Sequence, residues 1–144
     1  MNRIFCLLFA LTVATPALIG GEGWLTDLKS AQEMAKSEHK PLLMDFTGSD
    51  WCGWCIKLKA EVFSTKEFKA YAAQNLVLLE VDFPKKKEQS ADLKKTNQAL
   101  QKQYQIRGYP TIIVLNSEGK KVGQLGYMPG GPKAFIAALE KLKK

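Results

Sequence analysis

The feature that most constrains the fold is an alternation of short apolar runs with longer segments in which apolar residues recur at helical spacing. The apolar runs cover residues 42–46, 76–83 and 111–115. A run this short with no polar face is typical of a strand that is covered on both sides. The segments with helical spacing cover residues 26–38, 55–62, 65–74, 93–104 and 131–142.

The order of these segments predicts a mixed sheet. Because a helix between two buried strands usually forms the crossover between parallel neighbours, we expect the three apolar runs to pair in parallel. The turn residues Asn116-Ser117-Glu118-Gly119 indicate a hairpin into a fourth strand at 121–127, which adds an antiparallel edge. The fold class expected is therefore α/β, with a mixed central sheet flanked by helices on both faces.

Length and composition allow one domain of this kind. The chain has 144 residues, close to the roughly 150 that a single domain takes. Hydrophobic residues make up 46% and charged residues 24% of the chain, as in soluble globular proteins. These values disfavour a disordered chain, a collagen-like repeat and a protein with several membrane spans.

The first residues are typical of a secretory signal peptide. Arg3 precedes an apolar run at 4–13, and Thr15-Pro16-Ala17 then offers small residues before a cleavage site. The run is shorter than the roughly 20 residues that a membrane span needs. The alternative, a buried first helix of the domain, is disfavoured because the segment has no polar face. We expect residues 1–17 to be removed, leaving a periplasmic or secreted domain at 18–144 with no stable membrane insertion.

The motif Trp51-Cys52-Gly53-Trp54-Cys55 lies where the first apolar run ends and a helix begins. Cys52 is therefore placed at a helix N-terminus, where unpaired N–H groups and the helix dipole favour a thiolate. Cys55 follows one turn later on the same face, so it can attack a mixed disulfide formed at Cys52. The spacing predicts a two-electron dithiol/disulfide cycle.

Three other interpretations of the cysteine pair stay open. A structural disulfide closing so tight a loop constrains the unfolded chain little. A zinc or copper site needs further ligands, and the chain offers His39 and scattered methionines at no metal-ligand spacing. The third alternative is a binding module in which the cysteines are incidental. Redox exchange explains the motif better than any of these.

The chain resembles thioredoxin-fold proteins, and most closely the exported members that carry a W-C-x-W-C motif. The resemblance runs from about Trp24 to the C-terminus. Its matching elements, in order, are 42–46, 51–55, 81–82 and 104–111. It implies an exported thiol–disulfide oxidoreductase that acts on protein substrates with an unidentified redox partner and no cofactor beyond the Cys52–Cys55 disulfide. The competing class is a non-catalytic or metal-handling binding module with the same fold.

The resemblance also assigns roles to residues outside the motif. Pro110 matches the family's cis-proline, which faces the dithiol and leaves the backbone of Tyr109 and Thr111 to pair with an extended substrate. Asp45 matches the family's buried acid, whose pKa burial raises and which can accept a proton from Cys55. The alternative for Asp45 is an acid that reaches solvent at the strand end. Trp51 and Trp54 flank the thiols, and we expect them to form an apolar rim that binds substrate.

The chain departs from the thioredoxin pattern at three places. One additional residue separates Asp45 from Cys52, so we expect water to bridge Asp45 and Cys55. Leu78 stands where thioredoxins carry a lysine on the second strand. Gly53-Trp54 replaces Gly-Pro between the cysteines, which leaves the choice between reductant and oxidant open.

The basic excess is concentrated in one segment. The formal charge is +7, and Lys85-Lys86-Lys87 and Lys94-Lys95 contribute much of it. These lysines can bind an acidic partner or lipid head groups, but a solvated loop and helix face is the favoured interpretation. No aromatic residues interleave with them, so we expect no nucleic-acid partner. We expect the domain to be a monomer.

Overall fold

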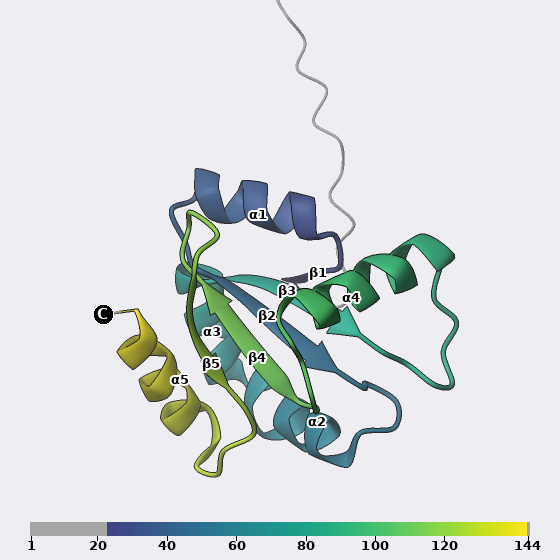
Figure 1. Ribbon diagram of the computed structural model, residues 1–144. Coiled ribbons are helices and arrows are strands. Elements are labelled where there is room, and N and C mark those ends of the chain that lie inside the picture. Colours follow the sequence, from purple (N-terminus) through teal and green to yellow (C-terminus); the bar gives the residue numbers. More distant parts are fainter. Residues whose placement is uncertain (1–22, 144) are drawn as a thin grey trace, which may run out of the picture.

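The computed structural model describes residues 23–143, so the predicted signal peptide at 1–17 lies outside the described residues. Its core is a five-stranded sheet in the order β1-β3-β2-β4-β5 (Figure 1). The strands are β1 (Trp24–Leu25), β2 (Leu42–Thr47), β3 (Val77–Asp82), β4 (Thr111–Leu115) and β5 (Lys121–Leu125). The helices are α1 (Leu28–Ser37), α2 (Gly53–Leu58), the π-helical η2 (Lys59–Phe63), α3 (Lys66–Asn75), α4 (Ala91–Gln103) and α5 (Gly131–Leu142).

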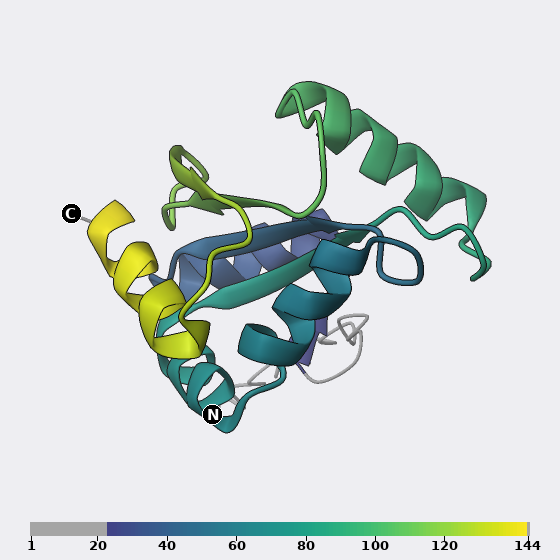
Figure 2. The ribbon, with the colours of Figure 1, turned by 90° about the horizontal axis from the view of Figure 1, so that it is seen from below.

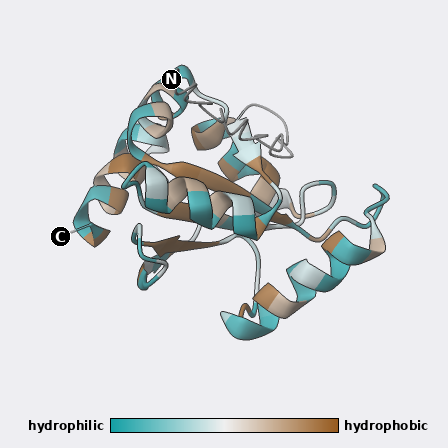
Figure 3. Ribbon diagram, turned by 90° about the horizontal axis from the view of Figure 1, so that it is seen from above, coloured by the Kyte–Doolittle hydropathy of each residue, from teal (hydrophilic) through white to brown (hydrophobic). Residues whose placement is uncertain are grey.

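Helices cover both faces of the sheet, as predicted. On one face, α1 and α4 pack on Leu42, Met44 and Phe46 of β2. On the other face, α2, η2, α3 and α5 pack on the sheet, where β2 presents Leu43. Figure 2 shows α4 on the opposite side of the sheet from α2, α3 and α5. In Figure 3 the central strands are coloured hydrophobic, whereas α4 carries much hydrophilic colour.

The pairing of β4 corrects the prediction of three parallel strands. Strands β1 and β2 run parallel to β3, but β4 is antiparallel to β2 and to β5. Thr47 at the end of β2 lies opposite Asp82, and Phe46 lies opposite Thr111, the first residue of β4. The chain therefore leaves β3 and enters β4 at the same end of the sheet. A helix between two strands implies parallel pairing only when the whole connection crosses from one end of the sheet to the other.

The helical region that follows Cys52 is broken between residues 63 and 66, as the separate segments at 55–62 and 65–74 predicted. Helix α2 passes into η2, which ends at Phe63 with Ser64 as its C-cap. Helix α3 then begins after Thr65, whose Oγ1 accepts a hydrogen bond from the Phe68 N–H at 3.2 Å. Thr65 is therefore the N-cap of α3.

Two further elements, β5 and β1, form the edges of the sheet. The hairpin between β4 and β5 is confirmed, and Asn116 Oδ1 closes its turn by accepting hydrogen bonds from two backbone N–H groups. Strand β1 was not predicted, because two residues are too few to show a periodicity. Within residues 23–143, no helix has the length and apolarity that crossing a membrane requires.

Candidate active site

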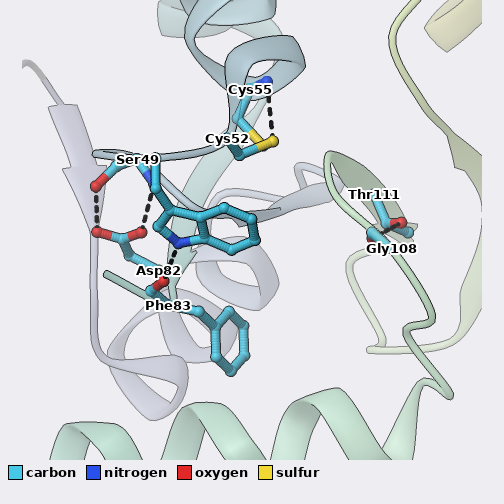
Figure 4. Close-up of a disulfide and its surroundings, with 8 residues drawn as sticks. Ser49, Cys52, Cys55, Asp82, Phe83, Gly108 and Thr111 are labelled. Atoms are coloured by element: carbon cyan, nitrogen blue, oxygen red, sulfur yellow. Dashed lines mark hydrogen bonds between the residues drawn. A yellow bond between two sulfur atoms is a disulfide. The ribbon is translucent and has the colours of Figure 1, made fainter. Parts of the chain in front are cut away.

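The two cysteines lie at the start of α2 and are joined by a disulfide (Figure 4). Cys52 is the N-cap residue of α2, and its Sγ accepts a hydrogen bond from the Cys55 N–H at 3.2 Å. Both residues are largely buried, with exposures of 7% for Cys52 and 4% for Cys55. The predicted position of Cys52 at a helix terminus is therefore confirmed, and its sulfur faces the polarised N–H groups that stabilise a thiolate.

A tight turn carries the chain from β2 to Cys52. The Gly48 carbonyl accepts hydrogen bonds from the N–H groups of Trp51 and Cys52, at 3.2 and 2.9 Å. A side chain on Gly48 would collide with the Trp51 indole, since an added Cβ would lie 2.5 Å from a ring carbon. Glycine is thus required at this position for the indole to fold back over the turn.

The Trp51 indole is fixed beside the disulfide by three residues from two other segments, the loop after β3 and the loop before β4. Its Nε1 donates to the Phe83 carbonyl at 2.7 Å. The Tyr109 ring meets it edge to face, with 5.9 Å between ring centroids, and Lys85 Nζ lies 3.9 Å from its centroid. The side chain still exposes 37% of its surface. Trp51 therefore forms a rigid, partly exposed surface next to Cys52.

Trp54 forms a second exposed aromatic surface on α2. It exposes 56% of its surface and packs against the Tyr127 ring, with centroids 4.9 Å apart. Lys57 Nζ lies over both rings, at 5.3 and 5.2 Å, and Ile56 beside it is 49% exposed. The sequence did not indicate Tyr127, because it comes from the loop after β5 and only the tertiary structure brings it to α2.

The segment before β4 faces the cysteines from the opposite side. The Tyr109–Pro110 peptide bond is cis, as the resemblance implied. Thr111 Oγ1 donates to the Gly108 carbonyl at 2.7 Å, and Figure 4 shows this loop across from the disulfide. Tyr109 is held by its hydroxyl, which accepts a hydrogen bond from Gln101 Nε2 at 2.6 Å. Because β4 is antiparallel to β2, Pro110 and the cysteines meet at one end of the sheet.

Asp45 is buried beneath α2, which decides against the alternative of an acid that reaches solvent. It is 8% exposed, and its alternation with Leu43 places it on the sheet face that α2 covers. The pKa of Asp45 is raised to about 8, mainly by burial and next by the negative charges of Glu80 and Asp82, while the positive charge of Lys59 opposes the rise. Asp45 Oδ1 accepts no hydrogen bond from the described residues, so no direct bond joins that oxygen to Cys55.

A polar cavity of about 350 Å³ opens beside Asp45. Lys59, Glu80 and Lys87 line it together with Asp45. Glu80 lies opposite Asp45 in the strand register, and burial also raises the pKa of Glu80. Leu78 carries no charge at the position of the thioredoxin lysine, as expected, but Lys59 brings a positive charge to the acid from η2.

Sequence reasoning missed Lys59 and Glu80, although each left a signal. Lys59 follows Cys55 by one helical turn. Glu80 interrupts the second apolar run as Asp45 interrupts the first. Acids at paired positions of two adjacent buried strands indicate a shared polar site beneath the helix that covers them.

The loop after β3 is fastened to the turn that precedes Cys52. Asp50 accepts hydrogen bonds from the backbone N–H groups of Lys85, Lys86 and Lys87 at 3.0, 2.7 and 2.9 Å. These bonds, that from Lys85 first, hold the pKa of Asp50 below its usual range. Ser49 donates to the Asp82 carboxylate from its N–H at 2.9 Å and from its hydroxyl at 2.5 Å. The lysine side chains are exposed, as expected for a solvated loop. Their backbone, however, is held in place beside the active site by the hydrogen bonds to Asp50.

Comparison with known proteins gives consistent results. Residues 28–143 match the family model of the thioredoxin-like domain. The chain is 40% identical over 114 residues to the disulfide bond reductase DsbH of Chlamydia pneumoniae, covering 79% of this chain and 69% of that protein. It is 30% identical over 123 residues to the thioredoxin-related protein DsbJ of the same organism, but spans only 35% of that protein's length. The solved structure of a DsbH oxidoreductase superposes with a TM-score of 0.79 and 34% identity, covering 94% of each chain.

The fold, the cysteine pair and these relatives agree. The family model covers most of the chain, and the DsbH structure reproduces the mixed sheet with helices on both faces. The chain therefore belongs to the thioredoxin-like family, and with its Cys52–Cys55 pair it is a thiol–disulfide oxidoreductase.

Proposed function

We propose that the chain is an exported enzyme that reduces disulfide bonds in protein substrates. The observation that carries this proposal is the Cys52 Sγ, placed at the start of α2 and faced by the cis-proline loop. The signal-like segment at 1–17 supports export to a periplasmic or extracellular space. The relative named as a disulfide bond reductase supports the reducing direction.

The reaction takes place in two exchanges. The Cys52 thiolate attacks one sulfur of the substrate disulfide, which forms a mixed disulfide and releases the other substrate sulfur as a thiolate. The Cys55 thiol then loses its proton and attacks Cys52 Sγ, releasing the second substrate thiolate. Two electrons pass to the substrate and the Cys52–Cys55 disulfide forms. An unidentified thiol partner regenerates the dithiol.

Substrate binding is assigned to the surfaces on either side of the cysteines. An extended segment of substrate pairs with the backbone around Pro110, where Tyr109 and Thr111 offer N–H and C=O groups. Trp51 and Trp54 contact the residues that flank the substrate cysteine. This arrangement holds the substrate sulfur in line with Cys52.

Asp45 is assigned as the group that takes the proton of Cys55, through water in the adjacent cavity. It lies under the same helix as Cys55 but makes no direct hydrogen bond to it through Oδ1. Only the carboxylate form can accept a proton, and with a pKa of about 8 this form is a minority at pH 7. The resolving step therefore gains rate as the pH rises through about 8.

We expect Asp45→Asn to slow the release of a mixed disulfide about tenfold and to remove the pH dependence near 8. Formation of the mixed disulfide should change much less, since Cys52 does not depend on Asp45 for its proton. Lys59→Met should keep the pH dependence and move its midpoint upward, because Lys59 lowers the pKa of Asp45. Stopped-flow kinetics resolve the two steps. An unchanged release rate and pH profile in Asp45→Asn contradicts the assignment.

Brief alkylation distinguishes the two thiols of the reduced protein. We expect iodoacetamide to label Cys52 at least about tenfold faster than Cys55, because the helix terminus lowers the pKa of Cys52 alone. Mass mapping of the labelled peptides measures the ratio, and Cys52→Ser provides the rate of Cys55 by itself. Equal labelling, or faster labelling of Cys55, overturns the choice of nucleophile.

The reducing direction is tested by the reduction potential of the Cys52–Cys55 couple. Strongly oxidising members of this fold, at about −120 mV, stabilise their thiolate strongly, whereas thioredoxin lies at about −270 mV. Among the described residues, Cys52 Sγ accepts a single hydrogen bond, from Cys55. We therefore expect a potential below about −200 mV in glutathione equilibration. A value near −120 mV contradicts a reductase.

A metal-handling module is the alternative function. Within residues 23–143, His, Cys, Asp and Glu form no cluster of three that could hold a metal ion. No observation on the described residues favours this alternative over disulfide exchange.

A further inference from the structure

We propose that a basic groove next to Trp51 selects the substrate, and that the enzyme prefers protein disulfides with acidic flanking residues. This inference rests on the proposed function, since it names the class of disulfide that Cys52 attacks. The basic groove has a volume of about 530 Å³ and lies between the loop after β3 and helix α4. Its polar lining consists of Lys85, Lys87, Lys94, Glu88, Gln89 and Gln98.

The chain segment that lines this groove carries most of the chain's net positive charge. Residues 83–107 contain seven basic side chains and two acidic ones, a net charge of +5 out of the chain's +7. The remaining residues are therefore close to neutral. A concave surface with lysines on both walls concentrates its field in the groove and attracts acidic segments of a partner.

The groove adjoins Trp51, the residue before Cys52, through two of its lining residues. Lys85 lines it and also lies 3.9 Å above the Trp51 ring, and Trp51 immediately precedes Cys52. Phe83, which also lines the groove, accepts the Trp51 Nε1 hydrogen bond. A substrate chain whose cysteine reaches Cys52 and crosses Trp51 therefore places its next residues between Lys85 and Lys94.

The acids near the groove do not neutralise these lysines. Asp50 is bound by three backbone N–H groups, and the Asp82 carboxylate by Ser49. Lys87 lies close to Asp50, but neither Lys85 nor Lys94 forms an ion pair with a described residue. Glu88 is the acid that faces the groove itself. A substrate carboxylate therefore finds two lysines available.

The loop that carries Lys85 is already ordered by Asp50, so binding costs little further conformational entropy. A concave groove beside the reacting sulfur fits an extended peptide segment better than a flat lipid surface. We therefore assign it to acidic residues of the protein substrate.

Three disulfide-bonded peptides test this assignment. They share one sequence except for two residues beside the reacting cysteine, which are Glu-Glu, Gln-Gln or Lys-Lys. At low ionic strength we expect the reduced enzyme to reduce the Glu-Glu peptide about tenfold faster than the Gln-Gln peptide and the Lys-Lys peptide slowest. At about 0.5 M salt the rates should converge, because salt screens exposed charges.

Two double variants with the same charge change provide the control. Lys85→Gln with Lys94→Gln should reduce the Glu-Glu to Gln-Gln rate ratio from about ten to about two or three. Lys120→Gln with Lys121→Gln should keep the ratio, because Lys121 pairs with Leu115 at the end of β4 away from the active site. If both double variants lower the rate ratio equally, net charge alone explains the preference, and the assignment of the groove to acidic substrate residues is wrong.

The remaining outcomes separate this inference from the proposed function. If all three peptides are reduced at equal rates, the reductase proposal stands and acid selection is wrong. If none is reduced, both proposals fail. If the rates are equal and the protein instead sediments with phosphatidylglycerol vesicles through Lys85 and Lys94, the groove is a lipid site and acid selection is wrong.

Discussion

Cys52→Ser is expected to lower insulin-disulfide reduction at least about a thousandfold, to the rate of the uncatalysed thiol reaction. The variant loses the sulfur at the start of α2, and Cys55 lies deeper, at 4% exposure, beneath the same helix turn. The measurement is the lag and slope of insulin precipitation with dithiothreitol as electron donor. Substantial activity in Cys52→Ser contradicts both the nucleophile assignment and the two-step cycle.

Cys55→Ser is the matched control, and it separates catalysis from binding. This variant keeps the attacking thiol but cannot complete the second exchange, so it should accumulate a mixed disulfide with its substrate. Mass spectrometry under non-reducing conditions detects the added substrate mass on Cys52. A binding module with incidental cysteines predicts that neither variant changes substrate binding and that no covalent adduct forms.

Asp45→Asn is expected to stabilise the oxidised protein at high pH. Folding raises the pKa of Asp45 from its ordinary value of 3.8 to about 8, so between these pH values the folded protein binds more protons than the unfolded chain. Stability therefore falls as the pH rises through this window, by up to about 6 kcal/mol in all. The amide keeps the shape of the side chain without the charge.

We expect the stability advantage of Asp45→Asn to grow by about 4 kcal/mol between pH 5 and pH 9 in urea unfolding. Asp50→Asn is the control of opposite sign. Hydrogen bonds from the 85–87 backbone lower the pKa of Asp50, so its charge contributes stability above the unfolded pKa that is lost as the pH falls. Removing that charge should lower stability at neutral pH. An Asp45→Asn advantage that does not change with pH contradicts a buried, uncharged Asp45.

Local patterns predicted most of the secondary structure and the chemistry-bearing pair. The apolar run at 42–46 became β2, and the Trp51–Cys55 motif became a turn followed by α2. These features depend on residues close together in the chain, where periodicity and capping act. The cis bond before Pro110 followed from the resemblance and not from any local pattern.

The errors concern contacts between segments that are distant in sequence. Strand β4 was expected parallel because its helix was taken as a crossover, whereas the loops on either side of α4 return the chain to the same end of the sheet. The charge near Asp45 was sought on β3, but Lys59 supplies it from η2. The side chains of the lysines at 85–87 are exposed, as expected, but the hydrogen bonds by which Asp50 fixes their backbone were not predicted.

The sequence by itself determined which residues carry the redox chemistry and which segments become strands and helices, because spacing and burial pattern are local properties. Only the tertiary structure decided what surrounds the cysteines. The antiparallel β4 brings Pro110 to Cys52, the register of β2 and β3 sets Glu80 opposite Asp45, and the fastened loop places Lys85 over Trp51. Each of these contacts joins residues at least 34 positions apart. They depend on the path of the connecting chain and on strand register, which local periodicity does not encode.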